Sequence, residues 1–206
     1  MNAYLDAASR YPCKCPTDWP NAGWFACTLC LPGDITDAAH AERLAARRRL
    51  VRRYSFAIPD DAAVAAIAAL SPLVEMGAGT GYWASLLAAA GADIVAYDQR
   101  PGRNDYTDHE PYFQVSLGVA ADAERHPDRT LFLCWPPMTG MAAKCLAHYR
   151  GQRLAYVGEG VGGCCADEAF FAALDREWCE VARQEIPRWQ YMRDELYIYE
   201  RKPCSR

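Results

Sequence analysis

The sequence lacks the features that mark membrane-spanning, secreted and nucleic-acid-coating proteins. No hydrophobic run approaches the roughly 20 residues that cross a bilayer, and residues 1–6 lack the basic and apolar regions of a signal peptide. The formal net charge of −4 argues against a broad surface for nucleic acid. Internal repeats are absent as well. We therefore expect a cytoplasmic protein with no membrane partner.

The composition that remains is that of a globular protein, with 51% hydrophobic and 23% charged residues. A chain of 206 residues is long enough for one α/β domain with a full core, together with a small appendage. These quantities leave the oligomeric state open.

The ten cysteines are unevenly distributed along the chain. Four of them lie near the N-terminus, in a segment rich in proline, glycine and aromatic residues that shows no helical or strand period. The pairs Cys13-x-Cys15 and Cys27-x-x-Cys30 supply four thiolates, enough for a tetrahedral structural Zn²⁺ site with Zn–S bonds of about 2.3 Å. Buried thiols without a metal and a redox pair are the alternatives. Residues 1–36 are thus expected to form a Cys-rich, zinc-stabilised module.

Residues 37–58 are expected to form a basic helix, from Asp37 to about Arg53, followed by an extended linker. The apolar side chains of the helix follow one side at the 3.6-residue period: Leu44, Leu50 and Val51. Arginines between Arg43 and Arg53 occupy the rest of its surface. They form either a solvated basic face or a surface for an anionic substrate or phosphate.

A glycine-rich turn lies at the centre of the sequence. Residues 73–83 read as a short buried strand, a tight turn and the start of a helix, with Glu75 just before the turn. Gly77, Gly79 and Gly81 alternate, so the backbone can take positive φ angles and approach a ligand with no Cβ in the way. The spacing is not the G-x-G-x-x-G of dinucleotide-binding enzymes, because the third glycine comes one residue early.

A second buried strand is expected over residues 93–98. It ends on Asp98, about twenty residues beyond the glycines, where a carboxylate can accept hydrogen bonds from both ribose hydroxyls of a bound nucleoside. The acid and the glycine turn together are far more specific than either feature alone.

The combination of Glu75-x-Gly-x-Gly-x-Gly with Asp98 resembles the signature of class I S-adenosylmethionine-dependent methyltransferases. The resemblance implies an α/β, three-layer Rossmann-like fold over residues 59–206, with a mostly parallel seven-stranded sheet that ends in an antiparallel strand. It also implies that the turn holds the methionine end of the cofactor S-adenosylmethionine and that Asp98 holds its ribose. The cofactor-binding residues expected on this basis are Glu75, Gly77, Ala78, Gly79, Gly81, Asp98 and Cys134.

The end of the fourth expected strand is the second informative place. A hydrophobic run meets a double proline, which cannot continue the ladder of a sheet, and reads Cys134-Trp135-Pro136-Pro137-Met138. In amino-methylating DNA enzymes of the resembled family, a polar residue directly precedes the two prolines and an aromatic residue follows them. The departure at both places argues against that mechanism. By the resemblance, Trp135 and Pro136 border the transferred methyl group, and a buried structural role is the alternative for Trp135.

Further candidates lie at other strand ends and in the linker. Glu159, at the carboxyl end of a fifth expected strand, is the best-placed carboxylate to position a substrate or take a proton, and a solvated loop acid is the alternative. Tyr54 and Phe56 are either pocket walls, by the resemblance, or core aromatics. Three residues of the polar loop on the ligand side are candidates for substrate contact: Arg100, Tyr106 and His109.

The leading hypothesis is a methyltransferase that acts on O, N or S of a small-molecule acceptor by in-line transfer, for which positioning and desolvation supply most of the rate. The first alternative is a nucleic-acid or protein methyltransferase that captures its substrate with the Cys-rich module and the arginine helix. The second is a non-catalytic S-adenosylmethionine-binding or zinc-scaffold protein. A small-molecule partner is favoured over a nucleic acid.

Overall fold

The computed structural model describes residues 2–11, 37–102, 107, 109–189 and 192–203. The four cysteines expected to bind zinc lie outside these ranges, as does Tyr106. In the helix that begins at Asp37, side chains are described from residue 41 onward. Within the ranges given, no helix combines the length and the apolar character needed to cross a membrane.

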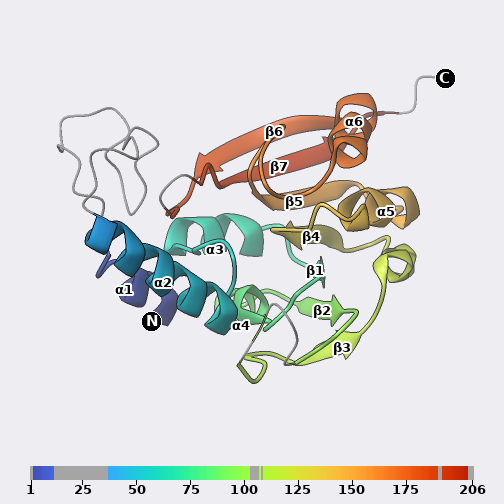
Figure 1. The fold of residues 1–206 in the computed structure, drawn as a ribbon. Coiled ribbons are helices and arrows are strands. Elements are labelled where there is room, and N and C mark those ends of the chain that lie inside the picture. The colour runs from blue at the N-terminus through green and yellow to red at the C-terminus, as the bar shows by residue number, and fades with distance from the viewer. Residues whose placement is uncertain (1, 12–36, 103–106, 108, 190–191, 204–206) are drawn as a thin grey trace.

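A seven-stranded sheet forms the centre of the molecule (Figure 1). Its strands are β1 (Leu73–Met76), β2 (Ile94–Asp98), β3 (Val115–Leu117), β4 (Thr130–Cys134), β5 (Arg153–Gly158), β6 (Trp178–Glu185) and β7 (Glu195–Arg201). They are ordered β3-β2-β1-β4-β5-β7-β6. The first five strands pair in parallel, and β7 is antiparallel to both β5 and β6. This is the mostly parallel Rossmann-like sheet that the methyltransferase resemblance implies, so the predicted fold of the α/β domain is confirmed.

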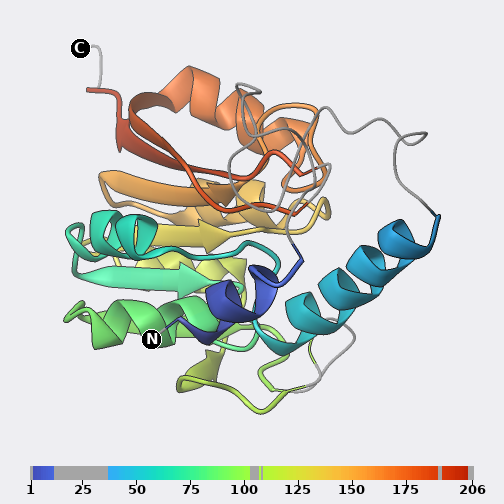
Figure 2. The same ribbon diagram turned by 90° about the vertical axis from the view of Figure 1, so that its left-hand side faces the viewer.

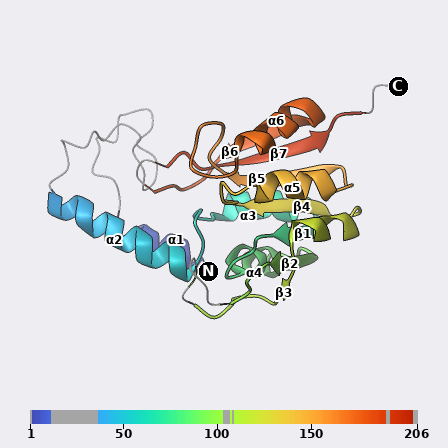
Figure 3. The same ribbon diagram turned by 45° about the vertical axis from the view of Figure 1, so that its right-hand side comes forward.

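Helices cover both faces of the sheet and complete the three layers (Figure 3). One face is covered by α3 (Asp61–Ala68) and α4 (Tyr82–Ala89), the other by η1 (Ala120–Arg125), α5 (Met141–His148) and α6 (Glu168–Glu177). Because both faces are covered, all four residues of β1 are buried, the acid Glu75 included. The carboxyl ends of β1, β2 and β4 meet at one edge of this buried core.

The two N-terminal helices form a third cluster beside this edge. They are α1 (Ala3–Ala8) and α2 (Asp37–Arg53). Tyr4 of α1 stacks on Tyr54, which follows α2, with ring centroids 5.0 Å apart. The Tyr4 hydroxyl accepts a hydrogen bond from the indole N–H of Trp189 at 2.9 Å, and its backbone N–H donates to the Tyr82 hydroxyl at 3.1 Å. Residues 2–11, which the sequence assigns to the Cys-rich module, thus pack on the α/β domain.

One expectation for α2 is wrong. Leu44, expected on the apolar side of the helix, is 38% exposed. The N-terminal part of α2 extends away from the sheet (Figure 2). Among its side chains described from residue 41 onward, the buried apolar ones are Ala46, Leu50 and Val51. The C-terminal end of α2, which leads into the linker, is therefore the part of the helix that packs on the domain.

Candidate functional site

The glycine turn is held in place by packing on two sides. Gly77, Gly79 and Gly81 have φ angles of 79°, 55° and 68°, which L residues with side chains rarely adopt. A Cβ at Gly77 would lie 2.8 Å from Met141 Cε, and one at Gly81 would lie 2.9 Å from Phe113 Cβ. At Gly79 the nearest side-chain atom would be 3.7 Å away. A Cβ at Gly81 would thus clash with the rigid Phe113 and Val115, whereas the Met141 side chain beside Gly77 can move, and Gly79 leaves room for a ligand.

Asp98 connects the second strand to this turn. The backbone N–H of Gly79 donates to Oδ2 of Asp98 at 2.9 Å, and the N–H of Arg100 donates to Oδ1 at 2.7 Å. The carbonyl oxygen of the preceding residue, Tyr97, accepts from Gly77 N–H at 2.8 Å and from Ala78 N–H at 3.0 Å. The turn after β1 and the end of β2 thus form one rigid hydrogen-bonded unit.

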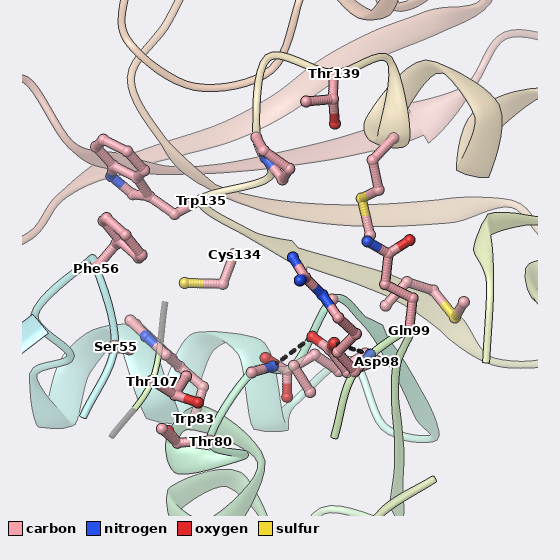
Figure 4. A pocket seen from close by; sticks show the side chains of 18 of the residues that line it. Ser55, Phe56, Thr80, Trp83, Asp98, Gln99, Thr107, Cys134, Trp135 and Thr139 are labelled. Atoms are coloured by element: carbon pink, nitrogen blue, oxygen red, sulfur yellow. Dashed lines mark hydrogen bonds between the residues drawn. The ribbon is translucent and has the colours of Figure 1, made fainter. Parts of the chain in front are cut away.

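A cavity of about 490 Å³ opens above this unit (Figure 4). Its floor is formed by residues 75–80 and 98–100, with further walls from residues 118–120, the loop after β4, and the linker after α2. In Figure 4 the side chain of Cys134 lies between the Phe56 and Trp135 rings on one side and Asp98 and Gln99 on the other. The cavity therefore has a glycine–carboxylate end, which we call the turn end, and an aromatic end, which we call the ring end.

The turn end contains a buried carboxylate with one open oxygen. Glu75 is 2% exposed and lines the cavity, and its Oε2 has no hydrogen-bond partner among the described residues. Burial, followed by the nearby charge of Asp98, raises the pKa of Glu75 to about 8. A buried carboxylic acid with an open oxygen is suited to bind a cation that enters the cavity, because pairing offsets the cost of burial.

The ring end is built from the linker and the loop after β4. Phe56 and Trp135 stack with centroids 4.9 Å apart and ring planes 16° from parallel. Trp135 has φ 51°, and its indole N–H donates to Oδ1 of Asp194 at 2.7 Å. Burial raises the pKa of the Cys134 thiol well above its usual value, so the thiol that faces the cavity stays protonated near neutral pH. The ring end is thus flat and apolar, and its thiol is in the unreactive protonated form.

The structure brings most of the expected site residues together. Glu75, Gly77, Ala78, Gly79, Asp98, Cys134 and Trp135 all line the cavity, as do Tyr54, Phe56 and Arg100. Gly81 lies behind the turn as the residue that precedes α4. Pro136 is buried, and its carbonyl accepts from Ala166 N–H at 2.7 Å, so it supports the loop from behind.

Two expected substrate contacts lie outside the cavity lining. Glu159 is 2% exposed, with Oε1 accepting from Arg193 N–H at 2.8 Å and Oε2 from Cys164 N–H at 2.6 Å. It is therefore neither a solvated loop acid nor a cavity-facing carboxylate. His109 stacks on Tyr112 at 4.5 Å and is likewise absent from the lining.

Several site residues have no signal in the sequence. Gln99, Thr107 and Thr139 line the cavity and follow strands or lie in loops, so only their position near strand ends points to them. Asp194 is buried behind Trp135 and falls in a stretch without any motif. Its role depends on a contact between segments 59 residues apart.

Comparison with known proteins gives weak similarities. No protein-family model and no curated protein matches the sequence. The magnesium protoporphyrin IX methyltransferase from Synechocystis PCC 6803 is 15% identical, with 82% of this chain and 85% of that chain covered and a TM-score of 0.41. A TehB-like SAM-dependent methyltransferase from Corynebacterium glutamicum is 17% identical, with 81% and 100% covered and a TM-score of 0.42. A tRNA (uracil-54, C5)-methyltransferase from Pyrococcus abyssi is 14% identical, with 68% and 37% covered and a TM-score of 0.41. Similarities this low do not identify an acceptor.

Proposed function

We propose that this chain is a class I S-adenosylmethionine-dependent methyltransferase that acts on a small, planar, weakly polar acceptor. The observation that carries the proposal is the unit formed by Asp98 and the Gly79 N–H at the floor of a cavity of about 490 Å³. It lies at the carboxyl ends of parallel strands, where open α/β sheets bind nucleotides.

Three features of the turn end fit this cofactor. The open Oε2 of Glu75 can pair with the ammonium of the methionine part. The space beside Gly79 admits a close approach of the ligand to the backbone. Each Asp98 oxygen already accepts one backbone hydrogen bond and has a second lone pair for a ribose hydroxyl. The resemblance assigns the methionine part to the glycine turn and the ribose to Asp98, and it includes Glu75 among the cofactor-binding residues.

The ring end fits the acceptor. Bound S-adenosylmethionine supplies a methyl group on a positively charged sulfur, and an in-line nucleophile takes it. Phe56 and Trp135 offer an apolar wall, and Pro137 and Met138 extend it. Such walls exclude water and orient a flat acceptor. The protonated Cys134 thiol does not compete for the methyl group, because the thiolate is the nucleophilic form.

A transfer screen tests the proposal. The protein is incubated with methyl-labelled donor and three naphthalenes that carry a hydroxyl, a thiol or an amine, in parallel with RNA and protein acceptors. We expect label on at least one naphthalene and none when Asp98 is replaced by alanine. Tight cofactor binding without transfer to any acceptor would instead support a non-catalytic binding protein.

One observation favours the macromolecular alternative. The exposed arginines Arg48, Arg49 and Arg53 lie on α2, and Val51 and Tyr54 at the end of the same helix line the cavity. A polyanion bound along α2 would therefore pass the mouth of the site. Two results together would favour this alternative. Binding of a labelled single-stranded RNA should weaken with salt, by roughly the 0.7th power of the salt concentration for each phosphate contact, and label should be transferred to RNA alone.

A zinc site of Cys13, Cys15, Cys27 and Cys30 also remains a proposal, supported by the spacing of the cysteines. Within the described part of the chain, no group of three or more His, Cys, Asp or Glu residues is arranged to hold a metal. Elemental analysis of protein purified without chelators tests the site. We expect about one zinc per chain for a four-thiolate site, and protein free of zinc would contradict it.

A further inference from the structure

The indole of Trp135 is held from behind by a buried carboxylate. The indole N–H donates to Oδ1 of Asp194 at 2.7 Å, and the backbone N–H of Trp135 donates to the Val157 carbonyl at 2.7 Å. The φ of 51° at Trp135 lies in the left-handed region, which costs an L residue roughly 1–2 kcal/mol. The surrounding contacts must offset this cost, and Asp194 is the residue that accepts the hydrogen bond of the single indole N–H.

Asp194 itself is unfavourably placed for stability alone. It is 1% exposed, and its Oδ2 has no hydrogen-bond partner among the described residues. Burial raises the pKa of Asp194 to about 7. A buried carboxylate with one open oxygen destabilises a fold unless something else requires it. The residue that Asp194 contacts, Trp135, forms part of the cavity wall.

A second buried carboxylate connects the same segment to another part of the wall. Oε1 of Glu159 accepts from the N–H of Arg193, the neighbour of Asp194, at 2.8 Å. Oε2 accepts from the N–H of Cys164 at 2.6 Å, and Cys164 lines the cavity. Residues 193–194 are therefore hydrogen-bonded to two wall residues, directly to Trp135 and through Glu159 to Cys164.

We propose that Asp194 is a positioning residue that sets the shape of the ring end by holding the Trp135 indole against Phe56, so that acceptor affinity depends on it. This rests on the proposed function, whose acceptor binds at the ring end. Asp194 touches neither the acceptor nor the cofactor, and Glu159 assists it by fixing the segment on which it lies.

The test uses three variants and 2-naphthol as a planar fluorescent probe, bound in the presence of S-adenosylhomocysteine so that no turnover is needed. In Asp194→Ala the indole N–H loses its acceptor, and we expect the Kd for 2-naphthol to rise about tenfold or more, as when a buried donor is left without a partner. Asp194→Asn keeps a side-chain oxygen and should restore the Kd to within about threefold of wild type. Affinity for S-adenosylhomocysteine, measured by calorimetry, should stay within about twofold in both, because Asp194 lies outside the cavity lining.

Trp135→Phe separates positioning from a general loss of stability. It keeps a ring beside Phe56 and removes the indole N–H, so adding Asp194→Ala in this background should change the 2-naphthol Kd by less than about twofold. The Trp135 indole resonance, assigned by its loss in Trp135→Phe, should shift in Asp194→Ala and return in Asp194→Asn.

Two results would overturn the proposal: an unchanged 2-naphthol Kd in Asp194→Ala, or an equal loss in the Trp135→Phe background. If Asp194→Ala does not fold, Asp194→Asn still tests the proposal, with Trp135→Phe identifying the indole resonance. A tenfold loss of 2-naphthol affinity in Asp194→Asn with an unchanged indole resonance would contradict positioning through the hydrogen bond. Failure of the wild type to bind 2-naphthol would contradict the acceptor assignment of the ring end. In that case, binding of S-adenosylhomocysteine would still show whether the proposed cofactor site is correct.

Discussion

The carboxylate of Asp98 accepts a hydrogen bond from the backbone N–H of Gly79 across 2.9 Å. The two residues come from different strands, since Gly79 follows β1 and Asp98 ends β2. The bond fixes the distance between the glycine turn and the acid, which in the proposed site hold the methionine part and the ribose of the cofactor. Cofactor affinity and the local order of the turn should therefore change together.

Replacing Asp98 by alanine removes the ribose contact and the partner of the Gly79 N–H. We expect the affinity for S-adenosylhomocysteine to fall by about tenfold to a hundredfold, because hydrogen bonds to a charged group contribute roughly 1.5–3 kcal/mol. Calorimetry measures the loss. Asp128→Ala, at an exposed acid far along the chain, is the control and should bind as the wild type does. Unchanged affinity in Asp98→Ala would contradict the ribose assignment.

Gly79 and Gly91 offer a matched pair of glycines with positive φ, 55° and 93°. An alanine at either position pays roughly 1–2 kcal/mol of backbone strain, and neither new Cβ would meet an atom closer than 3.7 Å. The melting temperatures of Gly79→Ala and Gly91→Ala should thus fall by similar amounts. Only Gly79→Ala should weaken binding of S-adenosylhomocysteine, and equal affinities in the two variants would count against a ligand close to Gly79.

Glu75 should release a proton when the cofactor binds. Its pKa of about 8 in the empty protein keeps most of it protonated at pH 7, and an ammonium paired with it favours the ionised form. Titrations of S-adenosylhomocysteine in two buffers of different ionisation enthalpy count the released protons. We expect up to about one proton at pH 7 for the wild type and fewer for Glu75→Gln. The assignment fails if the binding enthalpy is independent of the buffer in the wild type.

The same carboxyl should make the stability of the empty protein depend on pH. Burial raises the pKa of Glu75 from 4.5 to about 8, so the folded state binds a proton more tightly than the unfolded state. This contribution to stability is fully present below pH 4.5 and is lost as pH rises through about 8. Glu75→Gln removes the dependence. Its melting temperature relative to wild type should be higher at pH 8.5 than at pH 5, and a difference that is constant with pH would contradict the burial of an uncompensated carboxyl.

The fold could be predicted from the sequence because its signals are local. β1 is apolar apart from Glu75, and β4 is apolar after Thr130. Asp60 and Asp167 cap α3 and α6 by accepting from Ala63 and Phe170 N–H groups at 2.7 and 3.0 Å. The turn end of the cavity was predictable for a similar reason. Residue type and spacing alone indicate glycines that need positive φ and an acid at a strand end.

The ring end could not be predicted in the same way. Glu159 is at the strand end where a cavity-facing acid was expected, but backbone N–H groups of Cys164 and Arg193 turn its carboxylate inward. Asp194 contacts Trp135 only because β7 lies beside β5 in the folded sheet. Contacts of this kind depend on tertiary packing between distant segments, and no periodicity or motif in either segment records them.

Calorimetric titration of S-adenosylhomocysteine into the wild-type protein tests the central proposal most directly, since everything else depends on a cofactor held between Gly79 and Asp98. We predict one saturable site per chain that is lost or strongly weakened in Asp98→Ala while the variant remains folded. No detectable binding to folded wild-type protein at millimolar ligand, or equal binding to Asp98→Ala, would contradict it.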